Sequence, residues 1–159
     1  MSAITLMLGD EAATGRLATR IAAGARARDT IALSGPLGSG KTSFARAFIR
    51  ALGRGDEEVP SPTFTLVEIY SFPGRPPIWH FDLYRLKQAS EAIELDIEDA
   101  FAEGISLIEW PERLGALLPA ERLDVALAIP PGASDEATAR HATLTGRGRW
   151  ANLLDKVAP

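Results

Sequence analysis

Gly35-Pro36-Leu37-Gly38-Ser39-Gly40-Lys41-Thr42 matches the pattern G-x-x-x-x-G-K-[ST] at every position. Glycines at these spacings let the backbone curl, so that successive amide groups point inward and form a concave anion site. The lysine that closes such a loop reaches the β- and γ-phosphates of a nucleotide, and the next hydroxyl binds magnesium. We therefore expect these eight residues and Ser43 to bind a nucleoside triphosphate, with Thr42 as a magnesium ligand.

The sequence on both sides of the loop supports this interpretation. Thr30 to Ser34 is a short apolar run that predicts a buried strand leading into the glycines. After the loop, apolar residues recur at three- and four-residue spacing, which predicts a helix from Lys41 to Leu52 that ends at Gly53. Such a helix presents its free amides and positive dipole end to the same anion. The alternative is a glycine turn that merely caps a helix, and the order of strand, loop and helix argues against it.

The composition is that of an ordinary globular domain. The chain has 159 residues, of which 46% are hydrophobic and 24% are charged, so we expect a single P-loop ATPase domain over residues 1–159. It contains no cysteine, which excludes disulfides, thiolate zinc sites and cysteine nucleophiles. We find no targeting segment and no run of about 18 apolar residues that would span a membrane, so we expect a cytoplasmic protein.

Two negative observations narrow the choice of ligand. The formal net charge of −4 argues against direct nucleic-acid binding, which usually needs a basic face, so any role of RNA is expected to run through a partner. Guanine-specific P-loop proteins use an Asn-Lys-x-Asp element, and the only asparagine here is Asn152. A guanine reader of that type is therefore excluded, and ATP is the expected nucleotide.

The rest of the chain predicts an α/β fold, a P-loop NTPase-type three-layer α/β/α domain. We expect a mainly parallel central sheet plus an antiparallel hairpin, because turn residues at 72–77 separate two strands. A first helix is expected from Asp10, its N-cap, to about Arg26. The other expected elements are strands at Phe64–Tyr70, Ile78–Tyr84, Ile105–Trp110, Leu123–Ile129 and Arg140–Leu144, short helical segments at Ser90–Leu95 and Ile97–Phe101, and a closing helix at Trp150–Val157.

Acidic residues at two strand ends are candidates for the other half of an ATPase site. Glu109 and Asp82 each follow an apolar run, where parallel strands would leave the core. One carboxylate would hold the magnesium ion and the other would orient the attacking water. The alternative for each is an ordinary strand-end acid in a salt bridge. Ser61 and Thr63 lie before the next strand, where their hydroxyls are either contacts of magnesium or phosphate or ordinary turn residues.

Two further groups of side chains receive structural interpretations. Trp79 and His80 lie in the middle of an expected strand, so we predict that they pack in the core. Arg46, Arg50 and Arg54 are spaced four residues apart along the expected P-loop helix. A solvated helix face is the interpretation we favour for them, and a docking face for a partner or RNA phosphates is the alternative.

Four segments in this order resemble the TsaE (YjeE) family, a group of small bacterial ATPases needed for threonylcarbamoyladenosine modification of tRNA. The P-loop alone indicates only a superfamily, and the three later segments make the resemblance specific. The resemblance extends from about Thr14 to Arg113, and it implies a P-loop α/β domain that binds ATP and Mg²⁺. The four segments are Gly35–Thr42, Ser61–Leu66, His80–Leu86 and Ile108–Arg113.

The resemblance also implies roles for individual residues. Thr42 and Glu109 match the family's magnesium positions, and Asp82 matches an acid that is important for hydrolysis. Together with Lys41, the two acids form the expected catalytic set. Residues expected near these groups are Thr14 and Arg140, which match positions close to the nucleotide, and Trp110, which matches the aromatic residue after the metal ligand.

The family further implies partners. It works with the TsaB–TsaD pair, in which TsaD transfers the threonylcarbamoyl group to the tRNA and nucleotide turnover resets the complex. We expect hydrolysis that is slow alone and faster with the partners. Two other functions stay open on the residues alone. One is a small-molecule P-loop kinase, in which Arg85 or Arg113 would serve as a lid arginine, and the other is a nucleotide-gated binding module with negligible catalysis.

Overall fold

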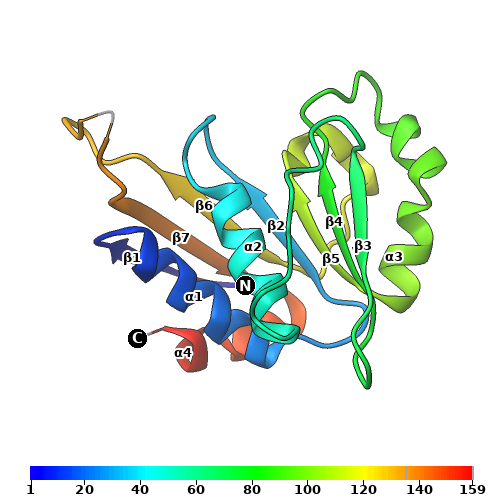
Figure 1. Cartoon of the computed structure of the whole chain (residues 1–159), viewed down its shortest axis with the longest axis horizontal. Helices are drawn as coiled ribbons and strands as arrows, with labels where there is room; N and C mark the ends of the chain where they lie inside the picture. The colour runs from blue at the N-terminus through cyan, green and yellow to red at the C-terminus, as the bar shows by residue number, and fades with distance from the viewer. Residues whose placement is uncertain (135, 159) are drawn as a thin grey trace.

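The computed structural model describes residues 1–134 and 136–158. Its strands form one sheet in the order β1-β7-β6-β2-β5-β4-β3, shown in Figure 1. The four strands β6, β2, β5 and β4 are parallel neighbours, while β3 is antiparallel to β4, and β7 is antiparallel to both β6 and β1. The strands are β1 (Ser2–Leu8), β2 (Thr30–Ser34), β3 (Val67–Tyr70), β4 (Ile78–Asp82), β5 (Ile105–Glu109), β6 (Leu123–Ala128) and β7 (Arg140–Gly146).

Helices cover both faces of this sheet, so the expected α/β fold with a mainly parallel sheet and an antiparallel hairpin is confirmed. The larger core lies between one face and two long helices, where Phe44 and Phe48 pack against Ile31 and Leu33. A smaller core on the opposite face joins Phe81 to the short helices near β4 and β5. The helices are α1 (Glu11–Gly24), α2 (Lys41–Leu52), α3 (Ile97–Glu103) and α4 (Leu154–Val157), and the 3₁₀ turns are η1 (Ala89–Leu95), η2 (Pro111–Leu117) and η3 (Gly148–Asn152).

The central unit of the fold has the bounds that the sequence predicts. Strand β2 and helix α2 begin and end at the expected residues, and Gly53 caps the helix with its amide on the Ile49 carbonyl. Asp10 is the N-cap of α1, because its carboxylate accepts a hydrogen bond of 2.8 Å from the Ala13 amide. Helix α1 ends at Gly24, two residues before the expected end.

The predictions at the sheet edges are less accurate. Strand β3 starts at Val67 rather than Phe64, because residues 63–65 form a turn and Leu66 has a left-handed φ of 69°. The closing helix expected at Trp150–Val157 is split into the turn η3 and the short helix α4. Strand β1 is absent from the sequence predictions, and only one side of it is buried against the core.

None of the helices within the described residues is both long and apolar enough to cross a membrane.

Candidate functional site

A pocket of about 340 Å³ opens at the carboxyl ends of the parallel strands. This is the usual ligand position in an open α/β sheet, because strand ends and helix N-termini meet there. The loop after β2 forms one wall, and the ends of β4 and β5 form another. The lining residues are Glu11, Thr14, Leu37, Gly38, Gly40, Lys41, Thr42, Ser43, Ser61, Thr63, Asp82, Glu109, Trp110, Thr138 and Arg140.

The loop between β2 and α2 has a backbone that needs glycine at defined positions. Gly40 is the N-cap of α2 and has a φ of 102°. This value lies in the left-handed region, which residues with a Cβ atom rarely adopt. Gly35 has a φ of 142°, and a Cβ atom there would clash with the Leu127 carbonyl and lie 2.6 Å from the Ser39 hydroxyl. The loop is therefore packed tightly against β6, with its inner side toward the pocket.

Lys41 is held inside the loop that it closes. Its Nζ donates hydrogen bonds to the carbonyl oxygens of Gly35, at 2.6 Å, and Pro36, at 2.9 Å. The ammonium group also lies 4.2 Å from the centre of the Trp110 ring, within the range of a cation–π contact. Burial lowers the pKa of Lys41, and the nearby carboxylates of Glu109, Glu112 and Asp82 oppose that shift. A positive charge is thus confined at the point where the loop curls.

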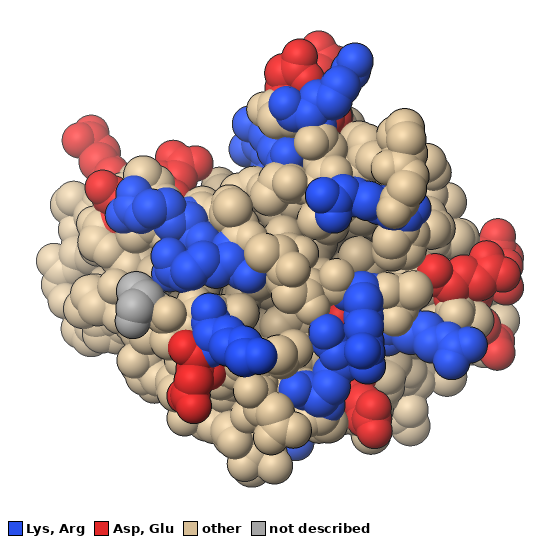
Figure 2. All heavy atoms as spheres, turned by 90° about the horizontal axis from the view of Figure 1, so that it is seen from below, with Lys and Arg blue, Asp and Glu red and all other residues tan. Residues whose placement is uncertain are grey.

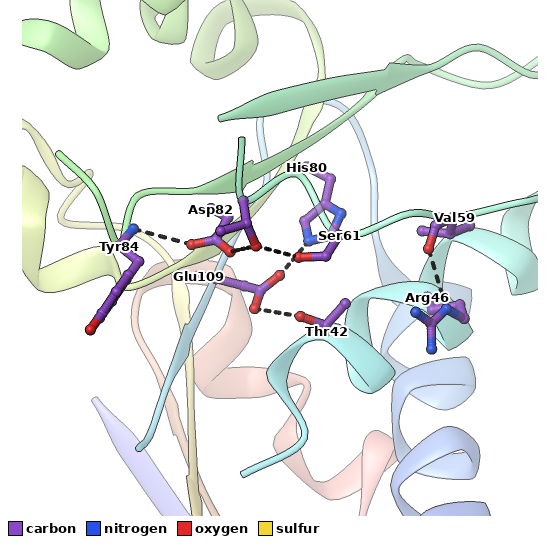
Figure 3. Close-up of polar contacts among 9 residues, drawn as sticks. Thr42, Arg46, Val59, Ser61, His80, Asp82, Tyr84 and Glu109 are labelled. Atoms are coloured by element: carbon purple, nitrogen blue, oxygen red, sulfur yellow. Dashed lines mark hydrogen bonds and ion pairs between the residues drawn. The ribbon is translucent and has the colours of Figure 1, made fainter. Parts of the chain in front are cut away.

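Glu109 connects the end of β5 to the start of α2. The residue is only 2% exposed, and its two oxygen atoms have different partners. Oε1 accepts a hydrogen bond of 2.9 Å from the Thr42 hydroxyl, and Oε2 lies 2.7 Å from Nε2 of His80. Figure 3 shows the Glu109 carboxylate between His80, from β4, and Thr42, from α2, with a contact to each.

Asp82 is the partner of Glu109 in the register of β4 and β5. Its Oδ2 accepts a hydrogen bond of 3.1 Å from the Thr63 hydroxyl, and its Oδ1 accepts one of 3.1 Å from the Tyr84 amide. The Ser61 and Thr63 hydroxyls are 2.7 Å apart, and Ser61 is the donor because the single hydroxyl hydrogen of Thr63 goes to Asp82. The loop before β3 is therefore tied to the carboxylate at the end of β4 (Figure 3).

Arg140, the first residue of β7, contacts the same loop. Its guanidinium group donates to the carbonyl of Ser39 at 3.0 Å and to the carbonyl of Gly38 at 2.9 Å. Thr14, from α1, is buried at the pocket wall. An arginine and a helix residue thus complete the pocket on the side away from Asp82.

The residues of this pocket fit a magnesium-bound nucleotide. Magnesium prefers oxygen ligands, and it is usually held by one or two carboxylates together with phosphate oxygens of the substrate. Thr42 and Glu109 supply adjacent oxygen atoms beside a loop whose lysine carries the positive charge. Among the described residues, no three His, Cys, Asp or Glu side chains group as a metal site.

Comparison with known proteins decides the family. The model of the family described as threonylcarbamoyl adenosine biosynthesis protein TsaE matches residues 8–136. The chain belongs to the TsaE family. The resemblance found in the P-loop and the three later segments is confirmed.

Several relatives carry the name tRNA threonylcarbamoyladenosine biosynthesis protein TsaE. The Bacillus subtilis protein is 37% identical over 141 residues, which are 89% of this chain and 84% of the relative. The Streptomyces coelicolor protein is 39% identical over 140 residues, or 85% of this chain and 92% of the relative. The crystal structure of Bacillus subtilis YdiB superposes with a TM-score of 0.76 and 28% identity, over 98% of this chain and 94% of that one.

The structure brings most of the residues predicted for a TsaE site into one pocket. Three of the predicted nucleotide-binding residues are not among the lining residues, namely Gly35, Pro36 and Ser39. The first two accept the hydrogen bonds of Lys41, and Ser39 is buried with no partner for its hydroxyl in the described residues. The predicted residues that line the pocket are Thr14, Leu37, Gly38, Gly40, Lys41, Thr42, Ser43, Asp82, Glu109 and Arg140.

Two predictions about residues around this TsaE pocket are confirmed only in part. His80 is buried as expected, but it bonds Glu109 and is more than a packing residue. Arg54 is exposed, as a solvated face requires, but Arg46 and Arg50 are partly buried and donate to the carbonyls of Val59, at 3.3 Å, and Glu57, at 3.1 Å. They hold the segment that leads to Ser61 and Thr63.

Sequence reasoning also missed two pocket residues of this TsaE chain. Glu11 and Thr138 line the pocket from the start of α1 and from the segment before β7. The Thr138 hydroxyl accepts a hydrogen bond of 3.2 Å from the Glu11 amide, which joins the two segments. Neither residue lies in a recognisable motif, and only the pairing of distant segments brings them together.

Proposed function

We propose that this chain binds ATP with Mg²⁺ and hydrolyses it, as a component of the machinery that makes threonylcarbamoyladenosine in tRNA. The observation that carries this proposal is the meeting of Lys41, Thr42, Glu109 and Asp82 in one pocket beside a glycine-rich loop. The names of the relatives support the tRNA-modification role, and the geometry of the pocket supports the nucleotide chemistry.

Each group has a defined task in this proposal. Lys41 and the amides at the start of α2 would bind the β- and γ-phosphates, which requires the lysine to give up its bonds to Gly35 and Pro36. Thr42 and Glu109 would hold the magnesium ion, which neutralises charge on the phosphates when it is bound. Arg140 already braces the carbonyls on the outer side of the loop, so it would keep the loop shape when phosphate enters.

Asp82 is the candidate that orients the attacking water. It lies beside Glu109 in the sheet, and the amide of Tyr84 and the hydroxyl of Thr63 fix its carboxylate. A carboxylate held in this way keeps one orientation at the pocket wall, which is what positioning a nucleophile requires. The Thr63 contact also links the carboxylate to the loop before β3, so movement of that loop would change the position of Asp82.

The proposed partners are TsaB and TsaD, with tRNA reached indirectly through them in the cytoplasm. Figure 2 looks at the end of the molecule opposite the P-loop, where Lys and Arg side chains gather and several have Asp or Glu beside them. Two arginines near the start of β2 already have internal partners. Arg28 donates to the carbonyl of Ala102, and Arg149 pairs with Asp29. These contacts and the net charge of −4 support a route to tRNA through partners.

Release of phosphate from ATP tests the proposal directly. The native chain should release phosphate slowly alone and faster when purified TsaB and TsaD are added, and Glu109→Gln should lose the magnesium-dependent part. Unchanged turnover with the partners would contradict the partner-dependent role. A phosphorylated acceptor in place of free phosphate would favour the kinase, although Arg85 and Arg113 do not line the pocket and contact Phe64 and Tyr84 instead.

A further inference from the structure

Within the described residues, the side chain of His80 has one hydrogen-bond partner, Glu109, which is a residue of the pocket. The imidazole lies in the middle of β4 and is 0% exposed, and its Nε2 is 2.7 Å from Oε2 of Glu109. It lies on the same face of the sheet as Glu109, two register positions before the end of the β4–β5 pair. A buried carboxylate is costly unless hydrogen bonds satisfy it, so this contact stabilises Glu109 in its buried position.

The bond also orients the Glu109 carboxylate, because one oxygen on the His80 ring leaves the other turned toward Thr42. A carboxylate has two equivalent oxygens, and rotation about its last bond exchanges them. With Oε2 held by the His80 ring, Oε1 is the oxygen that accepts the hydrogen bond of Thr42. The pair Thr42 and Glu109 therefore presents a fixed arrangement of oxygen atoms.

The second nitrogen of the ring shows that packing does not explain the histidine. Within the described residues, Nδ1 of His80 is buried and has no hydrogen-bond partner. A buried polar atom without a partner costs free energy, so an apolar side chain of similar size would fill this position better if packing were its only role. The contact with Glu109 is what the imidazole provides and an apolar side chain lacks.

We propose that His80 is a positioning residue, which donates from Nε2 to Glu109 and holds its carboxylate in the orientation that binds magnesium with Thr42. The inference rests on the proposed magnesium–nucleotide function, since it assigns His80 a task at that site. Outer partners of metal ligands orient those ligands, and their loss typically lowers metal affinity by about 10–100-fold.

The bond itself can be measured on the native chain without nucleotide. The chain has two histidines, so ¹⁵N NMR of labelled histidine gives two ring systems, and a His141→Gln variant assigns them. We expect the His80 ring to carry a hydrogen on Nε2. A ring that carries a hydrogen only on Nδ1 has no donor for Glu109, and this result would overturn the proposal whatever the nucleotide assays show.

The functional arm uses His80→Leu, which removes the donor, and His80→Gln, whose amide reaches a similar position. Ile78→Val is the matched control, because it loses a methyl group on the same strand and face but leaves the bond intact. Calorimetry would measure the affinity for ATP in EDTA and the magnesium concentration that gives half of the magnesium-dependent gain. For His80→Leu we expect that concentration to rise by about 10–100-fold, with the affinity in EDTA unchanged.

The magnesium concentration for half of the gain should be closer to the native value in His80→Gln than in His80→Leu. In Ile78→Val it should equal the native value. Native magnesium dependence in a folded His80→Leu variant would overturn the proposal, as would equal losses in His80→Leu and His80→Gln. If His80→Leu does not fold, His80→Gln decides, and loss of its magnesium dependence in a folded protein would overturn the proposal. A native chain without magnesium-dependent affinity would instead contradict the proposed function, and the NMR result would still report on the bond.

Discussion

The contacts of Lys41 within its own loop bear directly on the proposed activity. Its Nζ donates hydrogen bonds to the carbonyls of Gly35 and Pro36, and the ammonium group lies over the Trp110 ring. These contacts satisfy a buried cation. A phosphate that enters the loop would replace them with charge-assisted bonds, which are stronger than bonds to neutral carbonyls.

Replacing this lysine should therefore weaken ATP binding more than it weakens the fold. For Lys41→Ala we expect a loss of about 10–100-fold in ATP affinity, because a hydrogen bond to a charged group contributes about 1.5–3 kcal/mol. Lys87→Ala is the control, since Lys87 is an exposed lysine outside the pocket. Calorimetry with ATP measures both variants, and equal affinities for the two would contradict the role of Lys41.

Asp82 should separate catalysis from binding. Asp82→Asn keeps the shape of the side chain but lacks the charge that orients a water molecule, and its single oxygen can accept from only one of the Thr63 hydroxyl and the Tyr84 amide. We expect phosphate release to fall by about 100-fold or more, within the range attributed to a general base, while ATP affinity stays within a few-fold of native. Parallel measurement of turnover and affinity checks this split, and a variant that loses both equally would show that Asp82 serves binding.

At the scale of elements, the unit from β2 to α2 could be predicted and the segments that complete the pocket could not. The strand, the glycine loop and the helix are specified by neighbouring residues, so their bounds follow from local pattern. The contact between Thr63 and Asp82 joins positions 19 residues apart, and Arg140 reaches the loop across 101 residues. Sequence spacing alone does not reveal such pairings.

Asp29 and Arg149 form an ion pair between the segment before β2 and the turn η3. Nη1 of Arg149 is 2.6 Å from Oδ2 of Asp29, and the two side chains are 26% and 7% exposed. Burial raises the pKa of the Asp29 carboxyl, and the hydrogen bond from the Arg26 amide and the charge of Arg149 act against that shift. The pair therefore offsets the cost of a carboxylate at the base of the central strand.

Arg149→Met should destabilise the fold by about 1–3 kcal/mol near neutral pH, because it leaves the carboxylate of Asp29 with less compensation. Arg147→Met is the matched control. Its partner Asp124 is more exposed and keeps Arg122, so a loss of about 0–1 kcal/mol is expected. Urea denaturation measures both free energies of unfolding, and equal losses would contradict the importance of the buried pair.

The pH dependence of this difference has a definite sign. Removal of Arg149 raises the pKa of Asp29 further, so the folded variant binds a proton more readily than the folded native chain does. The deficit of Arg149→Met should therefore be largest at neutral pH and shrink as the pH falls through the raised pKa of Asp29, above its ordinary value of 3.8. A deficit that stays constant over this range would show that the effect is not electrostatic.

At the scale of the whole molecule, the central strands of the sheet could be predicted from the sequence and the edge strand β1 could not. Nearly all residues of β2 and β5 are buried, and in β6 buried residues alternate with more exposed ones. The first residue of each of these strands was predicted. Among the described residues, strand β1 pairs only with β7 and buries just one side, so its signal is weak. His80 was assigned to packing because its partner, Glu109, lies on another strand.

The central claim is that the glycine loop, Lys41, Thr42 and Glu109 form one site for ATP and magnesium. Calorimetric titration of the native chain with ATP, in magnesium and in EDTA, tests it most directly. We expect saturable binding that is clearly tighter with magnesium, and a Glu109→Gln variant that keeps the EDTA affinity but loses most of the magnesium-dependent gain. Equal affinity of the folded native chain in magnesium and EDTA, or no binding in either, would contradict the claim.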